Sequence, residues 1–223
     1  MSDRKKSSKL EKQRRTKARD VVPTLDLKKL VDLPPWEWPR EAPRVILRLL
    51  RDRLEPEADR ELAVTLVGDL CEQTEDTFKA CLQILACPEE SESLRCAAAI
   101  AIGPALEQAD GLDPEDQGEA WISTTLFEKA KATLHDLWKL PDLPKSLRRR
   151  ILEGAIRAPQ DWHSEAIRMA FLADDTEWKL TAVFAMNHVG GFENEILEAL
   201  EHPDPEIHLW AVMAAGAWEL EKA

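Results

Sequence analysis

Histidines near acidic residues are the first candidates for chemistry. The tripeptide Asp161-Trp162-His163 holds an acid and a base, but helix positions one or two residues apart do not face each other. We therefore interpret the tripeptide as a turn that enters a helix rather than as a catalytic pair. His202 and His208 lie on either side of two prolines with no third ligand nearby, so we expect no metal ion there.

The four cysteines form no recognisable redox or zinc motif. Cys71, Cys81, Cys87 and Cys96 are separated by gaps of 10, 6 and 9 residues, without a C-x-x-C pair. Each lies in an apolar run, so we interpret them as reduced core residues of a protein in a reducing, cytosol-like compartment. The sequence also contains no glycine-rich phosphate loop, no G-x-S-x-G and no H-E-x-x-H. We predict no catalytic residue, no cofactor and no metal site.

Two groups of side chains are candidates for contact with a partner. Arg148, Arg149 and Arg150 form a local basic cluster in an acidic chain. Trp162 and Trp210 are the best candidates among the eight tryptophans, because tryptophan is enriched at interface hot spots. Packing in the core is the alternative for both tryptophans.

The elements that must position these residues are predicted to be helices. Apolar residues recur at helical spacing from residue 43 onward, for example at Phe78, Cys81, Leu82 and Leu85. Strict alternation of apolar and polar residues is absent, and β-branched residues are sparse. Helix-breaking pairs divide the chain near residues 55–56, 87–88, 140–141, 174–175 and 202–205. The sequence therefore predicts an all-α protein.

An internal repeat follows these breaks. In each unit a basic residue, here called the opener, begins a second helix, with alanine three positions later and glycine or asparagine eight positions later. Four units keep this pattern, with openers Arg60, Arg95, Lys179 and His208, alanines Ala63, Ala98, Ala182 and Ala211, and final residues Gly68, Gly103, Asn187 and Gly216. Small side chains at fixed positions let neighbouring helices approach closely, and glycine or asparagine suits a helix end. A fifth unit, at about 122–159, has Arg148 as its opener but isoleucine at both small positions.

Segments 94–103 and 207–216 resemble HEAT repeats, in the short form described in phycobilisome-lyase-like proteins, and the acidic turn at 201–206 resembles the inter-helix turn of that family. The resemblance extends from about Pro43 to Ala223. It implies a right-handed α-solenoid of about five HEAT-like helix pairs that binds other macromolecules. It also implies that the openers form a structural ladder, each reaching a carboxylate or carbonyl in the adjacent turn; a ligand-binding stripe is the alternative.

Charge divides the chain into two parts. Residues 1–20 carry a net charge of +6, which leaves −18 on residues 21–223. Residues 1–33 are predicted to form a basic, disordered N-terminal arm, because so few large apolar side chains cannot offset the entropy of ordering. The arm either binds an anionic partner through residues 1–20 or is a solvated tail. Residues 34–223 are expected to form the HEAT-like solenoid, with an acidic loop insertion at about 109–120.

Composition limits the classes of function. No apolar run approaches the length of a membrane span, and no apolar stretch follows the basic N-terminus as in a secretory signal, so we expect a cytoplasmic protein. An acidic body is poorly suited to duplex nucleic acid. We expect a non-enzymatic scaffold that binds another protein. The alternative is a solenoid enzyme or enzyme subunit, similar to a bilin lyase or to a DNA alkylation-repair glycosylase.

The last repeat leads to a separate hypothesis. Terminal repeats of a solenoid normally carry a polar outer face, yet the segment from Trp210 to Trp218 is apolar. We expect this end to dock a partner, to self-associate, or to continue into further repeats.

Overall fold

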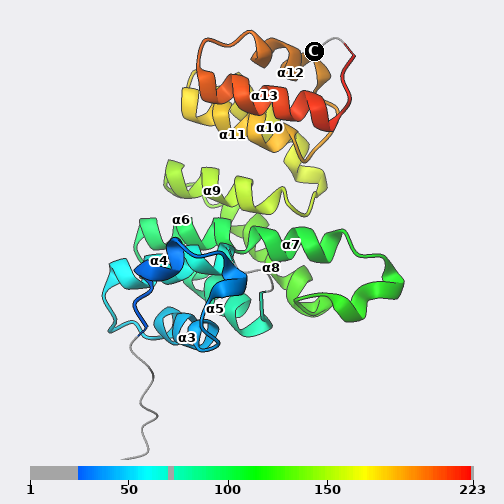
Figure 1. Cartoon of the computed structure of the whole chain (residues 1–223). Helices are drawn as coiled ribbons and strands as arrows, with labels where there is room; N and C mark the ends of the chain where they lie inside the picture. Colours follow the sequence, from blue (N-terminus) through cyan, green and yellow to red (C-terminus); the bar gives the residue numbers. More distant parts are fainter. Residues whose placement is uncertain (1–24, 70–72, 222–223) are drawn as a thin grey trace, which may run out of the picture.

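A computed structural model describes residues 25–69 and 73–221 of the 223-residue chain. Within these ranges the regular secondary structure is helical, as predicted, and the helices stack from α3 at one end to α12 and α13 at the other (Figure 1). The helices are α2 (Lys28–Val31), η1 (Pro35–Glu37), α3 (Ala42–Arg51), α4 (Glu57–Gly68), α5 (Glu75–Ala86), α6 (Glu92–Ala101), α7 (Gly103–Asp110), η2 (Pro114–Glu119), α8 (Thr124–Trp138), α9 (Lys145–Ala155), α10 (Asp161–Leu172), α11 (Thr176–Met186), α12 (Glu193–Leu200) and α13 (Pro205–Ala217).

Consecutive helices pack in pairs that match the units of the sequence repeat. The pairs are α3–α4, α5–α6, α8–α9, α10–α11 and α12–α13. The second helix of each pair also contacts the next second helix, in the order α4, α6, α9, α11 and α13. We call this series the second-helix row. Helices α7 and η2 lie between the second and third pairs, where the acidic insertion at 109–120 is expected.

Two sequence breaks turn out to be helix caps. The carboxylate of Asp175 accepts hydrogen bonds from the main-chain N–H groups of the first turn of α11, and Asp204 does the same for α13. Ser91 caps α6, and Thr74 forms a capping box at the start of α5. These side chains satisfy N–H groups that have no partner within their helix. Asp175 and Asp204 belong to predicted breaks, whereas Ser91 and Thr74 do not.

The openers bind the C-terminal ends of the first helices. In four units the opener contacts a main-chain oxygen: Arg60 that of Leu50 (3.5 Å), Arg95 that of Leu85 (2.9 Å), Arg148 that of Trp138 (3.1 Å) and His208 that of Leu200 (2.6 Å). In the remaining unit the Lys179 ammonium lies 5.2 Å from the ring centre of Phe171. Because the C-terminal end of a helix attracts cations, the ladder joins the two helices of a unit, as the structural interpretation predicts.

Small residues allow close contact along the second-helix row. Gly103 of α7 lies against Gly154 of α9, and Gly68 of α4 lies against Ala101 of α6. A Cβ atom on Gly154 would lie 2.1 Å from the main-chain oxygen of Ala99. Gly68, Gly103 and Gly154 therefore act in helix packing.

The basic arm is described only in part. Residues 1–24 lie outside the described residues, and the rest of the predicted arm packs on the domain. Leu27 and Leu30 are buried, and α2 contacts α4. The indole Nε1 of Trp38 donates hydrogen bonds to the main-chain oxygens of Leu30 (3.1 Å) and Leu33 (2.9 Å). The folded part of the chain thus begins before residue 33.

Candidate functional site

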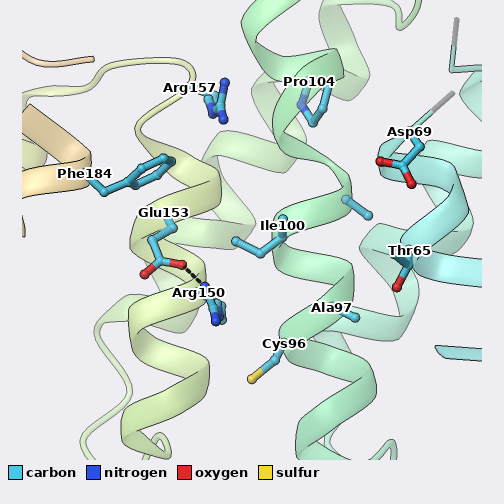
Figure 2. Close-up of a pocket in the computed structure, with 12 residues that line it drawn as sticks. Thr65, Asp69, Cys96, Ala97, Ile100, Pro104, Arg150, Glu153, Arg157 and Phe184 are labelled. Carbon is cyan, nitrogen blue, oxygen red and sulfur yellow. Dashed lines mark hydrogen bonds and ion pairs between the residues drawn. The ribbon is translucent and has the colours of Figure 1, made fainter. Parts of the chain in front are cut away.

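An open hollow of about 510 Å³ crosses the second-helix row. Figure 2 shows residues that line it; they come from α4, α6, α7, α9 and α11 and from the turns that follow α4 and α9. The lining residues are Thr65, Gly68, Asp69, Cys96, Ala97, Ile100, Ala101, Pro104, Arg150, Glu153, Arg157 and Phe184.

Repeat register explains why these residues meet. The residue five positions after each opener lines the hollow in the first four units, and these residues are Thr65, Ile100, Glu153 and Phe184. This position therefore marks the face of these second helices that forms the hollow. Ile100 is 40% exposed there although it is aliphatic. The hollow therefore offers apolar surface at its centre.

Charged residues of both signs flank that apolar surface. Arg150 donates a hydrogen bond to Glu153 (2.5 Å), which also accepts one from the Thr181 hydroxyl (2.6 Å). Arg157 donates to Glu107 (2.6 Å), and its guanidinium lies 5.7 Å from the ring centre of Phe184. Glu153 is almost fully buried, so its carboxylate is committed to these structural bonds.

Cys96 and Cys81 are poor nucleophiles. Burial raises the pKa of Cys96, which lines the hollow, and raises the pKa of Cys81 to about 12. Because the thiolate is the reactive form of cysteine, both residues stay protonated near neutral pH. Cys81 is buried and matches the predicted role of a core residue. Cys87 and Cys96 are only partly buried, and Cys87 follows α5, where its sulfur accepts a hydrogen bond from Arg53 and donates one to Glu89. The prediction of core residues is therefore wrong for these two, and Cys71 lies outside the described residues.

The three consecutive arginines of the predicted basic cluster point in different directions. Arg148 contacts the C-terminal end of α8 as an opener. Arg149 is buried between α9 and α11, where it donates to Thr181 (2.9 Å) and Glu177 (2.8 Å). Arg150 alone of the three lines the hollow, with its side chain 48% exposed. Successive helical residues diverge, so the cluster in sequence is not a cluster in space.

The two candidate tryptophans are half-buried in aromatic contacts. Trp162 stacks on His135, with ring centres 5.2 Å apart, and packs against Trp138 at 5.4 Å. It does not line the hollow. Trp210 meets Phe184 edge to face, with ring centres 4.7 Å apart. Trp210 thus supports a residue that does line the hollow.

His163 has a structural role. Its ring is buried, and Nδ1 accepts a hydrogen bond from the main-chain N–H of Gln160 (3.0 Å). Burial, with a smaller effect from the nearby His135, lowers the pKa of His163 to about 4. The ring is therefore neutral near pH 7 and helps to cap α10. Among the described residues, no group of three or more His, Cys, Asp or Glu side chains is arranged to hold a metal ion.

Comparison with known proteins does not identify a function for this hollow. No family model matches the chain. No curated protein is similar to it in sequence. Within residues 25–69 and 73–221, no helix has the length and apolar character needed to cross a membrane. The hollow must therefore be interpreted from its own geometry.

Sequence reasoning missed most of the residues that line the hollow. Ile100 and Phe184 were not selected, although the signal was present: both stand five positions after an opener. Arg157 follows α9, outside the repeat pattern, so the repeat alone gave no signal for it.

Proposed function

We propose that this chain is a HEAT-like α-solenoid that acts as a non-enzymatic scaffold and binds a segment of another protein in the hollow of its second-helix row. The observation that carries the proposal is the hollow itself, which is open, about 510 Å³ in volume and lined in four units by the same repeat position. Repeat proteins commonly bind partners on such continuous surfaces. The contacts in chain order from α4 to α13 also support stacking as a solenoid.

The chemistry of the walls describes the partner. Ile100 and Phe184 offer apolar surface for one or two aliphatic or aromatic side chains. The side chains of Arg150 and Arg157 are partly exposed and can bind polar or acidic groups of the same segment. The arginines already have carboxylate partners within the chain, so we expect apolar contact to supply most of the affinity, as at other interface hot spots.

The test has two steps. Proteins captured from an extract of the source cells by the full chain are identified, and the binding of each purified candidate is then measured by calorimetry. Ile100→Asp should weaken binding by about 100-fold, because it places a charge in the apolar centre of the contact. Leu172→Asp is the matched control, since Leu172 is 82% exposed on α10 and does not line the hollow. A captured partner that binds the Ile100→Asp variant as tightly as the wild type would remove the hollow from the proposal.

The same experiment addresses the basic arm. A chain that begins at residue 25 keeps Leu27 and Leu30, which belong to the core. If residues 1–24 bind an anionic partner, this truncated chain should lose affinity mainly at low salt, because screening weakens contacts between exposed charges. Equal affinity of the two chains at low salt would support the solvated-tail interpretation.

A further inference from the structure

The outer face of α13 is more exposed than the equivalent face of the other second helices. Four positions after the opener, the side chain is fully buried in each of the four preceding units, as seen for Val64, Ala99, Leu152 and Val183. The corresponding residue of α13, Val212, is 48% exposed. The residues one and eight positions after the opener are also buried or half-buried in the four preceding units. The corresponding residues of α13, Leu209 and Gly216, are exposed.

These positions are the ones that meet the next helix of the row. Gly68 lies against Ala101 of α6, and the main-chain oxygen of Ala99 lies against Gly154 of α9. Outside the backbone of α13 itself, no atom of the described residues lies within 4 Å of the position that a Cβ atom on Gly216 would take. Helix α13 is apolar nearly all round, which is typical of a helix buried on every side. Its outer face therefore has the form of a contact surface for one more helix of the same kind.

The two ends of the second-helix row differ. At the α4 end, α2 packs on α4. Leu66 stands six positions after its opener, the position at which α6 and α9 contact the preceding second helix. Leu66 is 1% exposed. A second copy of the chain therefore cannot add head to tail, because α2 already occupies that end. A second copy that uses the same α13 face meets the first copy about a two-fold axis.

We propose that two copies of this chain dimerise through the outer faces of their α13 helices, packed antiparallel about a two-fold axis. This contact lies outside the hollow, so it is independent of the proposed scaffold function.

The α13 face is complementary to itself in this arrangement. An antiparallel pairing centred between Val212 and Met213 places Leu209 of each copy over Gly216 of the other. A glycine without a Cβ atom leaves room for the larger leucine and lets the helices approach closely. The face formed by Leu209, Val212 and Gly216 carries no charge. Each copy has a formal net charge of −12, so added salt should strengthen the dimer by screening the repulsion between copies.

Sedimentation of the full chain over a wide concentration range tests the proposal. The wild type should show a concentration-dependent monomer–dimer equilibrium. Val212→Glu should raise the dissociation constant by about 100-fold, because it buries two unpaired like charges near the axis. Gly216→Leu should also weaken the dimer, by filling the space for Leu209. Both changes lie on an exposed face, so circular dichroism should show that the variants fold.

The controls separate this contact from the hollow. Leu172→Glu changes an exposed leucine on α10 and should leave the dimer intact, as should Ile100→Asp. A wild-type chain that stays monomeric at all concentrations would overturn the proposal. A dimer that forms equally well with Val212→Glu would also overturn it, because the contact would then lie elsewhere.

Crosslinking gives a second measurement. Residues near a two-fold axis lie close to their own counterparts, so mild oxidation of the Val212→Cys variant should produce a disulfide-linked dimer. Leu172→Cys retains the same native cysteines and serves as the control. Equal crosslinking of the two variants would contradict a two-fold contact at α13.

Discussion

At the scale of single residues, the polar groups that are buried in this chain mostly join helices to one another. Arg149 links α9 to α11 through Thr181, and Glu153 accepts bonds from the same two helices. Arg60 makes a buried ion pair with Glu90, with a nitrogen–oxygen distance of 2.6 Å. Removing one member of such a pair leaves the other charge buried without a partner. These buried polar contacts therefore fix the relative positions of the helices that they join.

His163 gives a prediction about pH. Its pKa is about 4 in the folded chain against 6.5 for an ordinary histidine, so between these values the unfolded chain binds more protons than the folded one. The free energy of unfolding should therefore fall as pH falls from 6.5 toward 4, with a loss of about 2 kcal/mol between pH 7 and pH 5 from this residue. His163→Asn keeps a side-chain acceptor for the Gln160 N–H and should lose this part of the pH dependence. Urea denaturation at the two pH values measures it, and equal losses in wild type and variant would refute the assignment.

At the scale of helices, the repeat pattern predicted much of the fold because its signals are local. An opener marks each unit, four of the five units also carry small residues at fixed offsets, and the structure places a helix at each of these positions. The unit at about 122–159 follows the repeat pattern less closely. Ile151 and Ile156 occupy its small positions, and the close helix contact is made by Gly154 instead. The hollow was not predicted. Thr65, Ile100, Glu153 and Phe184 share a position but no chemical character, and only packing in three dimensions brings them together.

The glycines of two second helices give a prediction at this scale. Gly154→Ala would place a Cβ atom 2.1 Å from the main-chain oxygen of Ala99, and relief requires α6 and α9 to move apart. We expect a loss of about 3 kcal/mol in the free energy of unfolding, the upper part of the range for overpacking. Gly216→Ala on α13 is the matched control. It meets open space and should stabilise the chain by about 0.5–1 kcal/mol, since alanine favours a helix.

Denaturation at a protein concentration low enough to keep the chain monomeric separates these effects from any contact between copies. A Gly154→Ala variant as stable as the wild type would mean that the contact between α6 and α9 is looser than the structure shows.

At the scale of the whole molecule, the second-helix row is covered at one end and open at the other. Helix α2 packs on α4, with Leu27 and Leu30 buried, whereas among the described helices α13 has one second-helix neighbour, α11. The hydrophobic core consists of two clusters, one from α2 to α9 and a second from α9 to α13. Stability in a repeat array is close to a sum of contacts between neighbours. The α12–α13 pair, with the fewest neighbours, should therefore be the least stable unit.

Amide hydrogen exchange tests this gradient. At low protein concentration the main-chain amides of α13 should exchange through local opening, with protection at least about 10-fold below that of α9, a difference of about 1.4 kcal/mol. Helix α9 has second-helix neighbours on both sides and should exchange only with more extensive unfolding. If two copies pair through α13, raising the concentration should increase the protection of α13 and leave that of α9 nearly unchanged. Equal protection of both helices in the monomer would instead show that the two core clusters unfold as one cooperative unit, with stability set by the molecule as a whole rather than by neighbouring repeats.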